Sequence, residues 1–206
     1  MILGIAIVLG AGLWYLQSAD KPAATDADPA ANAHVVYGSA DAPVTVVEFS
    51  NYLCPHCKHH AEQSLPLIFK DYVETGKVRY IFRDLPFPNQ PQVELAAQAA
   101  DCTYEQGKYL EYHELLFRAN DQWGRASLSE LPRYFSDYAA QLGLDVARFE
   151  ACLDEGRTRA WVEEDKALAE KLNIKGTPSF FVNGEFIEGF RPYDEWRTIL
   201  DKALSR

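Results

Sequence analysis

The hydrophobic and polar positions of this chain predict β-strands in its first half and again near its C-terminus. Residues 43–50 are mostly apolar and β-branched on both parities, which is typical of a strand buried on both faces of a sheet. Residues 77–83 alternate and indicate a second strand. Residues 179–188 predict a hairpin around Asn183-Gly184, a pair that favours a type I′ turn.

Helical spacing accounts for much of the remaining pattern. Residues 56–75 place apolar side chains three and four positions apart, with Pro66 expected to kink the helix and Gly76 to end it. Together with the two early strands, this helix has the length expected of a right-handed crossover between parallel strands. Residues 193–204 predict the last helix.

The segment between the two groups of strands shows almost no strand signal. Helical patterns occur there at residues 94–105, 109–118, 128–142, 146–155 and 158–172. We therefore expect an α/β fold in which an all-helical insertion, about residues 85–173, separates the N- and C-terminal halves of the sheet. A chain of 206 residues suits one such domain, which we place at residues 35–206.

The N-terminal segment predicts contact with a membrane. No charged side chain precedes Asp20, so residues 1–17 are interpreted as a membrane anchor or a signal segment. The alternatives are cleavage of a signal near residues 31–33 and a buried core helix. Residues 18–34 are rich in Ala, Asp and Pro and predict a flexible linker. With either an anchor or a signal, the domain is exported.

The formal net charge of −10 narrows the range of partners. Binding to nucleic acid without regard to its sequence needs clustered Lys and Arg, which this chain does not show. We therefore expect no nucleic-acid partner. The acidity otherwise indicates only a soluble, mutually repelling surface.

The candidate chemistry centres on the motif Cys54-Pro55-His56-Cys57. The motif lies between a strand and a helix, at the carboxyl end of the strand, where open α/β sheets place their sites. Unpaired N–H groups and the helix dipole favour negative charge at a helix start, so Cys54 is the expected thiolate. Pro55 suits the first helical position because its φ is fixed and it has no N–H to leave unpaired.

Basic residues around the motif are expected to stabilise that thiolate further. His56 adds a donor, or a positive charge, beside the Cys54 sulfur. Lys58, His59 and His60 are expected to act in the same direction. A stabilised thiolate favours the reduced pair, so the disulfide is expected to be oxidising.

Two cysteines at this spacing are also half of a zinc site, and that alternative stays open. Zinc needs two further ligands, yet no second pair of cysteines or histidines occurs at the usual structural spacing. An inert structural disulfide is another alternative. We favour a redox centre that uses no metal and no cofactor.

Thr177-Pro178 directly precedes the first strand of the predicted hairpin. A peptide bond before proline can be cis, and at a strand edge it leaves the backbone of the preceding residue free to pair with a substrate strand. Because of this context we expect the cis form here.

The strand at residues 44–49, the motif Cys54-Pro-His-Cys57 and the segment Gly176-Thr-Pro-Ser-Phe-Phe-Val-Asn-Gly184 together resemble the DsbA-like thioredoxin-fold family. The resemblance covers nearly everything from residue 34 onward, including the helical insertion. It implies that Cys54 is the attacking sulfur and Cys57 the buried resolving thiol. It also implies that Pro178 is a cis-proline facing them and that Thr177 touches the pair and tunes it.

Three further residues take their roles from this resemblance. Glu48 matches the buried acid beneath the active site, which carries a proton to or from Cys57 and should have a raised pKa. The alternative is a strand-end glutamate exposed to solvent. Cys102 and Cys152 lie on predicted helices of the insertion and are expected to form a structural disulfide, with two buried free thiols as the alternative.

These observations predict an exported thiol–disulfide oxidoreductase that exchanges the Cys54–Cys57 disulfide with protein thiols, working as an oxidase. The partners implied are exported proteins with free cysteines, a redox protein that reoxidises the pair, and the membrane through residues 1–17. The expected location is periplasmic or otherwise extracytoplasmic. The alternatives are a reductase or isomerase of the same fold, and a module that binds peptides or soft metals.

Overall fold

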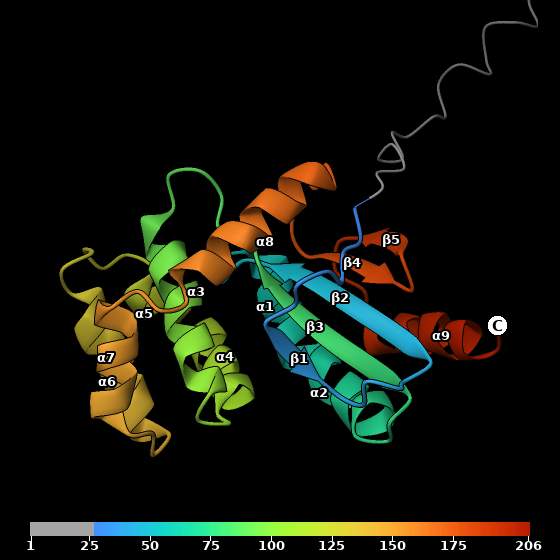
Figure 1. Cartoon of the computed structure of the whole chain (residues 1–206), viewed down its shortest axis with the longest axis horizontal. Coiled ribbons are helices and arrows are strands. Elements are labelled where there is room, and N and C mark those ends of the chain that lie inside the picture. Colours follow the sequence, from blue (N-terminus) through green and yellow to red (C-terminus); the bar gives the residue numbers. More distant parts are fainter. Residues whose placement is uncertain (1–26) are drawn as a thin grey trace, which may run out of the picture.

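A mixed five-stranded sheet forms the centre of the molecule in a computed structural model that describes residues 27–206 (Figure 1). The strands lie in the order β1-β3-β2-β4-β5, with β2 and β3 parallel and the other neighbours antiparallel. Their bounds are Val35–Tyr37 for β1, Val44–Ser50 for β2, Val78–Asp84 for β3, Ser179–Val182 for β4 and Glu185–Glu188 for β5. The predicted α/β class and four of these strands are confirmed, whereas β1 was not expected.

The predicted membrane segment, residues 1–17, lies outside the described residues, as does the first part of the predicted linker. Within residues 27–206, no helix combines the length and the apolar character needed to cross a membrane.

The side chains of β2 enter two separate cores, as the sequence pattern of the strand predicts. Val44 and Val46 face the larger core, and Val47 and Phe49 face the smaller one on the other side of the sheet. Every position of β2 except Thr45 is buried. The strand is therefore held on both faces immediately before the cysteine motif.

The chain after β2 forms helix in four short pieces rather than one. They are α1 (Pro55–His59), the π-helical η1 (His60–Ser64), α2 (Leu65–Ile68) and the π-helical η2 (Phe69–Val73). Pro66 has no N–H to donate to the preceding turn, so a wider turn beside it is the expected accommodation. The predicted kink is thus realised as a change of helix type, and His60 at the start of η1 is fully buried.

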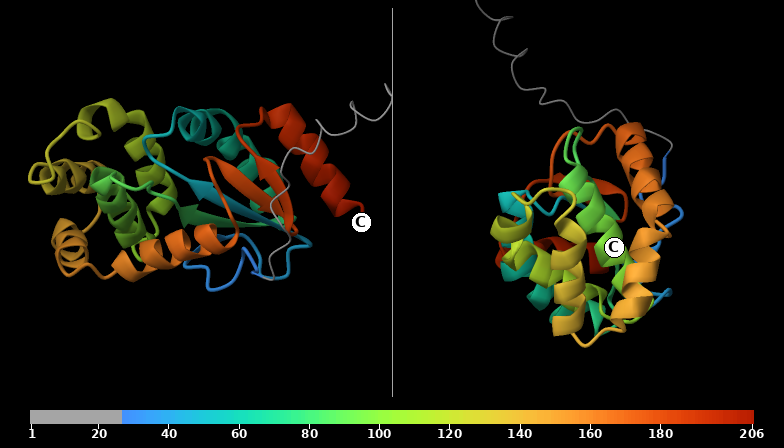
Figure 2. Two further views of the ribbon diagram at one scale, coloured as in Figure 1. Left: turned by 90° about the horizontal axis from the view of Figure 1, so that it is seen from above. Right: turned by 90° about the vertical axis from the view of Figure 1, so that its left-hand side faces the viewer.

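Residues 85–178 contain only helices and loops, which confirms the predicted insertion. The helices are α3 (Pro91–Tyr104), α4 (Tyr109–Arg118), α5 (Asn120–Trp123), α6 (Leu131–Gln141), α7 (Val146–Asp154) and α8 (Arg159–Lys171). Helices α3 to α7 lie together at one end of the sheet, and α8 runs from them across a sheet face (Figures 1 and 2). The expected disulfide between Cys102 and Cys152 is present and links α3 to α7.

The C-terminal hairpin and helix follow their sequence signals closely. Asn183 and Gly184 have φ angles of 48° and 81°, both in the left-handed region that a type I′ turn requires. The Asn183 side chain accepts a hydrogen bond of 2.8 Å from the N–H of Thr45, which ties the turn to the start of β2. Helix α9 (Tyr193–Leu204) buries Trp196 and Leu200 in the larger core.

Residues 27–34 contact the sheet, although the sequence analysis places them in a linker. Arg83 of β3 is buried and donates hydrogen bonds to the carbonyls of Pro29, Ala31 and Asn32. Its guanidinium also pairs with Asp165 of α8 at 2.7 Å. A buried guanidinium needs partners for its donors, and these backbone carbonyls supply them. The contacts of the domain therefore begin before residue 35.

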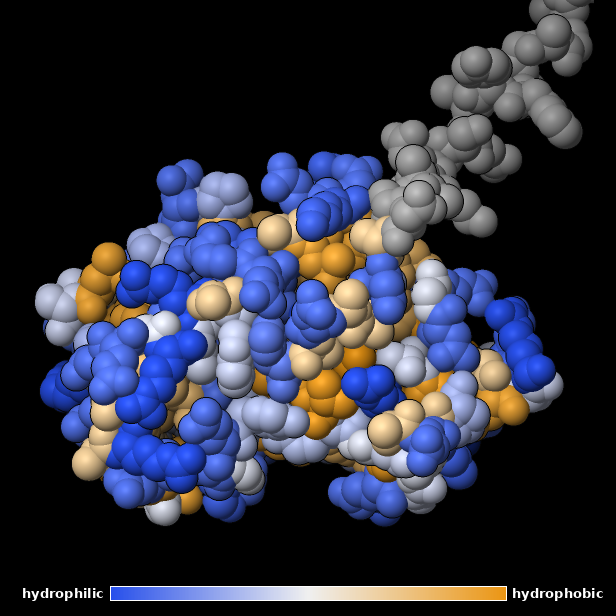
Figure 3. All heavy atoms as spheres, in the orientation of Figure 1, coloured by the Kyte–Doolittle hydropathy of each residue, from blue (hydrophilic) through white to orange (hydrophobic). Residues whose placement is uncertain are grey.

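The surface facing the viewer in Figure 1 is largely hydrophilic, with smaller apolar areas between the charged side chains (Figure 3). Among the large hydrophobic side chains of residues 27–206, only Leu67 and Leu128 are exposed. This surface agrees with the net charge of −10.

Candidate active site

The cysteine motif lies at the junction of β2 and α1. Cys54 is the N-cap residue of α1, with extended backbone angles, and Pro55 is in the first helical turn. The N–H of Cys54 donates to the carbonyl of Asn51 at 2.9 Å. The Asn51 side chain accepts from the N–H of Leu53 and donates to the carbonyl of Leu85, each at 2.9 Å. These bonds fix the loop that carries Cys54 to the end of the sheet.

Hydrogen bonds to its sulfur lower the pKa of Cys54 to about 5. The largest contribution comes from the Cys57 thiol; partial burial of the sulfur opposes it, and the Thr177 side chain and the backbone N–H groups of Cys57 and His56 add to the lowering. The sulfur is half-buried and therefore reachable. Cys54 is a thiolate at neutral pH at the start of a helix, as its position predicts.

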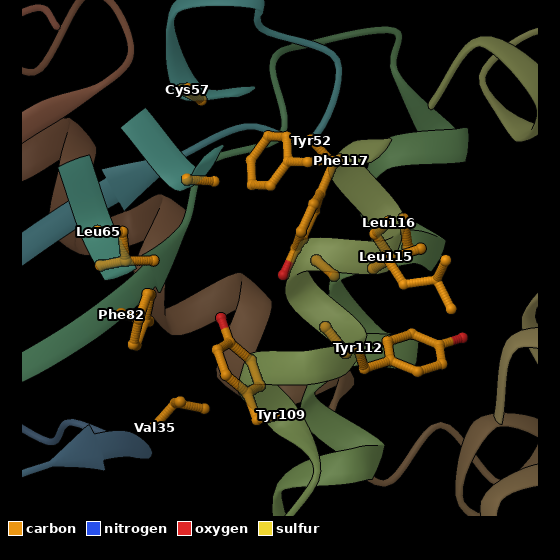
Figure 4. Close-up of a cluster of buried hydrophobic side chains, with 14 of the residues drawn as sticks. Val35, Tyr52, Cys57, Leu65, Phe82, Tyr109, Tyr112, Leu115, Leu116 and Phe117 are labelled. Atoms are coloured by element: carbon orange, nitrogen blue, oxygen red, sulfur yellow. The ribbon is translucent and has the colours of Figure 1, made fainter. Parts of the chain in front are cut away.

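Cys57 has the opposite environment. Its side chain is fully buried, and this burial, followed by the adjacent Cys54 sulfur, raises its pKa well above the ordinary value. Figure 4 shows Cys57 at the edge of a buried cluster that also contains Tyr52 and Leu65. One sulfur is charged and accessible, and the other is protonated and enclosed.

The loop before β4 completes the site from the far end of the sequence. The peptide bond between Thr177 and Pro178 is cis. The Cys54 sulfur lies 3.2 Å from the carbonyl oxygen of Thr177, to which it can donate when protonated, although the two residues are separated by 123 positions in the chain. The Thr177 hydroxyl lowers the pKa of both Cys54 and Cys57. Antiparallel pairing of β4 with β2, in which Ser179 lies opposite Phe49, brings this loop to the motif.

Glu48 is fully buried, so the exposed alternative does not apply. Burial raises its pKa to about 7, and the hydrogen bond from Tyr80 and the nearby Ser50 hydroxyl oppose that rise. The hydroxyl of Tyr80 donates to Oε2 of Glu48 at 2.7 Å. A carboxyl group with a pKa near neutrality can both accept and release a proton under physiological conditions.

The basic residues of the motif do not act as a group on Cys54. His60 points into the core, where burial, followed by the nearby His113, lowers its pKa to about 3. The expectation that His60 adds positive charge at Cys54 is therefore wrong, because its ring lies on the buried helix face three residues after Cys57 and stays neutral there. His56 and His59 are exposed, and His56 acts on the sulfur through its backbone N–H. Lys58 is directed towards Asn120 at 3.4 Å.

Two side chains beside Glu48 were not predicted from the sequence. Ser50 lies two positions further along β2 and faces the same side of the sheet, so strand alternation could have identified it. Tyr80 is on β3, opposite Val46, and reaches Glu48 diagonally. Identifying Tyr80 requires the register between β2 and β3, which cannot be read from the sequence.

A metal-binding arrangement does not form around the motif. In the part of the chain that the structure describes, no three His, Cys, Asp or Glu side chains come together in a way that could hold a metal ion. The side chain of His60, close to the motif in the sequence, is buried in the core instead.

Titration of the reduced protein is expected to show a thiolate transition near pH 5, followed through the ultraviolet absorbance of the thiolate. Because the folded pKa of Cys54 is depressed, ionisation stabilises the reduced fold at neutral pH, and this contribution is lost as the pH falls through 5. A Cys54→Ser variant serves as the control and should show no transition in this range. A transition near the ordinary pKa of a free thiol would contradict the geometry described for Cys54.

Fold and site geometry agree with comparisons to known proteins. The family model described as thioredoxin matches residues 30–202. The chain belongs to the thioredoxin family. Disulfide bond formation protein D of Bacillus subtilis is 31% identical to it over 184 residues, which cover 88% of this chain and 82% of that protein. A putative protein-disulfide oxidoreductase of Rickettsia typhi is 28% identical, with 84% and 63% covered.

Solved structures place this thioredoxin-family chain beside DsbA-like proteins. Oxidised BdbD from Bacillus subtilis has a TM-score of 0.72 at 32% identity, covering 83% of this chain and 92% of that one. Wolbachia pipientis alpha-DsbA1 has a TM-score of 0.74 at 27% identity, covering 85% and 92%. These likenesses confirm the predicted DsbA-like fold and the class of thiol–disulfide oxidoreductase.

The same kind of domain also aligns with part of a much larger protein. Na⁺/H⁺ antiporter NhaA 3 of Salinispora tropica is 37% identical over 160 residues, which cover 77% of this chain but 22% of that protein. This chain spans about a fifth of that relative. The name of the whole antiporter therefore does not describe the aligned segment.

Proposed function

We propose that this thioredoxin-family protein is an exported oxidase that introduces disulfides into proteins through Cys54 and Cys57. The observation that carries the proposal is the asymmetry of the two sulfurs, since Cys54 is an accessible thiolate with a pKa of about 5 and Cys57 is buried and protonated. A stabilised thiolate lowers the free energy of the reduced pair. The corresponding disulfide therefore takes up electrons readily.

The reaction starts from the oxidised pair. A substrate thiolate attacks the Cys54 sulfur, a substrate–Cys54 disulfide forms, and Cys57 leaves and takes up a proton from Glu48. A second substrate thiolate then attacks the substrate sulfur of this mixed disulfide, which releases the Cys54 thiolate. The substrate has lost two electrons and gained a disulfide, and the Cys54–Cys57 pair is reduced.

The loop at Thr177 and Pro178 is proposed to align the substrate. The Thr177 carbonyl lies 3.2 Å from the Cys54 sulfur, so the backbone of this loop borders the attack position. An extended substrate segment can pair with that backbone as an added strand. The Thr177 hydroxyl also lowers the pKa of both thiols, so this residue adjusts the proton affinity of the redox pair.

The setting of the reaction is part of the same proposal. Residues 1–17 tether the domain to a membrane, or direct its export, and residues 18–34 connect this segment to the sheet. The active site then faces an extracytoplasmic space, where disulfides persist. Its substrates are exported proteins with free cysteines. A redox protein at the membrane must reoxidise Cys54 and Cys57 after each turnover.

The equilibrium reduction potential of Cys54 and Cys57 tests this proposal. Protein equilibrated with mixtures of reduced and oxidised glutathione, then alkylated and weighed by mass spectrometry, should give an oxidising value, less negative than about −200 mV. A value near −270 mV, as for a reducing thioredoxin, would assign the chain to reductases instead. If Cys54 and Cys57 did not exchange with glutathione at all, the result would contradict any redox function.

A further inference from the structure

Glu48 lies in a closed set of polar side chains beneath Cys57. The Tyr80 hydroxyl is 2.7 Å from Oε2 of Glu48 and 3.0 Å from Nε2 of His60, and that nitrogen is 3.7 Å from Oε2. All three side chains are fully buried. Among the described residues, His60 is the only basic side chain within ion-pair distance of Glu48. The buried acid is therefore held by a tyrosine and a histidine, and not by a lysine or an arginine.

The positions of the protons in this set follow from its donors and acceptors. Tyr80 has one proton and donates it to Glu48, so its oxygen accepts from His60, which must carry its own proton on Nε2. The other ring nitrogen, Nδ1, is then unprotonated and has no hydrogen-bond partner in the described chain. The ring packs between Phe180 and Trp196, with centroid distances of 4.7 and 5.6 Å, which fixes this orientation.

The other carboxyl oxygen of Glu48 faces a different neighbour. Within residues 27–206, Oε1 of Glu48 and the hydroxyl of Ser50 are buried and form no hydrogen bond of ordinary geometry. Ser50 nevertheless lies close enough to lower the pKa of both Glu48 and Cys57. Burying a hydrogen-bond acceptor without a partner lowers the free energy of unfolding, so an acceptor kept in this state is a candidate for a functional role. Ser50 follows Glu48 by two positions on β2, on the same face of the sheet, and its hydroxyl acts on both the carboxyl and the Cys57 thiol.

We propose that Tyr80 and His60 are positioning residues of the thiol–disulfide reaction, because they occupy Oε2 of Glu48 and leave Oε1 to exchange a proton with Cys57 through the Ser50 hydroxyl. The proposal rests on the proposed function, since only a reacting Cys57 needs a proton acceptor. It assigns roles to three side chains, on β2, β3 and η1, that the cysteine motif does not contain.

The proton transfer accompanies closure of the disulfide. The Cys57 proton moves to the Ser50 oxygen while the Ser50 proton moves to Oε1 of Glu48, and the resulting Cys57 thiolate attacks Cys54. The bond between Cys54 and its thiol partner breaks, and the partner leaves as a thiolate with the electron pair. In the opposite direction, Glu48 returns a proton by the same path to the leaving Cys57 sulfur.

Other titratable groups near this set are shifted towards their neutral forms. Burial lowers the pKa of His113 on α4 to about 3. Burial, followed by neighbouring acidic groups, raises the pKa of Asp84 at the end of β3, and the same two causes raise the pKa of Tyr52 in the loop before Cys54. The remaining neighbours of His60, Phe180 on β4 and Trp196 on α9, do not titrate. Burial therefore sets the raised pKa of Glu48, and the hydrogen bond from Tyr80 limits that rise.

A two-step reaction with an aromatic disulfide, dithionitrobenzoate, separates the roles of the two cysteines. The first coloured thiolate is released when Cys54 of the reduced protein attacks the reagent. The second is released when Cys57 closes on the Cys54 adduct. The rate of the second release should fall as the pH decreases through 7, because Glu48 is then protonated and cannot accept the Cys57 proton.

Tyr80→Phe removes the donor to Glu48 and should move the midpoint of the second release upward by about one to two pH units. The first release should keep the midpoint of the wild-type protein. Tyr112→Phe is the matched control, because Tyr112 is also fully buried and donates one hydrogen bond, to the carbonyl of Phe135 at 3.0 Å, but lies in the insertion. In Tyr112→Phe, the rate of the second thiolate release should have the same pH dependence as in the wild-type protein.

His60 supplies an independent second test. His60→Phe should move the midpoint in the same direction as Tyr80→Phe, whereas His60→Gln keeps a donor for the Tyr80 oxygen and should restore much of the wild-type profile. His113→Phe is the control for loss of a buried imidazole. Equal midpoints for Tyr80→Phe, His60→Phe and their controls would overturn the proposal. A wild-type protein without any second release would instead overturn the proposed function itself.

Discussion

Replacing Cys54 with serine is expected to lower the rate of dithiol oxidation by roughly a thousandfold or more, because the variant lacks the only accessible sulfur of the pair. The measurement is the oxidation of a peptide with two cysteines by stoichiometric oxidised protein, followed by chromatography. The remaining sulfur, Cys57, is fully buried and has a raised pKa, so it is a poor nucleophile and a poor target.

Cys57→Ser is the matched variant and should fail at a different step. It retains the Cys54 thiolate, so it should react with a substrate disulfide and then stop as a stable mixed disulfide that mass spectrometry detects. Cys54→Ser should form no such adduct. If Cys54→Ser kept substantial activity, or if the adduct accumulated on Cys57, the assignment of the two sulfurs would be reversed.

Replacing Cys102 and Cys152 with alanine should lower the free energy of unfolding by about 4 kcal/mol, and the melting temperature by about 10 °C. The disulfide joins positions 50 residues apart in the chain, and a crosslink of this span restricts the unfolded ensemble strongly. It also holds α3 against α7, so its loss should loosen the insertion first. Urea unfolding followed by circular dichroism measures the effect.

The same double variant should leave the reduction potential of Cys54 and Cys57 unchanged. None of the groups that lower the pKa of Cys54 belongs to α3 or α7. A control with Cys54 and Cys57 both replaced by alanine should lose the redox reaction but keep the disulfide of the insertion. Equal unfolding free energies for the wild-type protein and the Cys102/Cys152 variant would show that this disulfide does not stabilise the fold.

Strong local patterns explain why the sequence analysis found most of the fold. The strand before the cysteine motif is buried on both faces and needs no distant information to be recognised. The turn at Asn183 and Gly184 is specified by the conformational preferences of two neighbouring residues. By contrast, β1 has only three residues and exists because it pairs with β3, so its sequence alone carries too little signal.

Contacts between distant residues explain what the sequence analysis missed. Carbonyls of residues 29–32 are held by Arg83, which cannot be inferred from a segment rich in Ala, Asp and Pro. The burial of His60 is completed by its contacts with Phe180 on β4 and Trp196 on α9, which are distant in the chain. His60 also lies three residues after the buried Cys57, on the same helix face.

The sequence by itself determined the redox chemistry and its place in the fold: two cysteines at the start of a helix, a distant Thr177-Pro178, and an acid in a buried strand. These follow from residue types, spacing and strand or helix periodicity, which are local properties of the chain. Only the tertiary structure decided how far each sulfur is buried and which groups surround Glu48. Burial and hydrogen bonding across β2, β3, η1 and the loop before β4 set those properties, because desolvation depends on every element packed around a group.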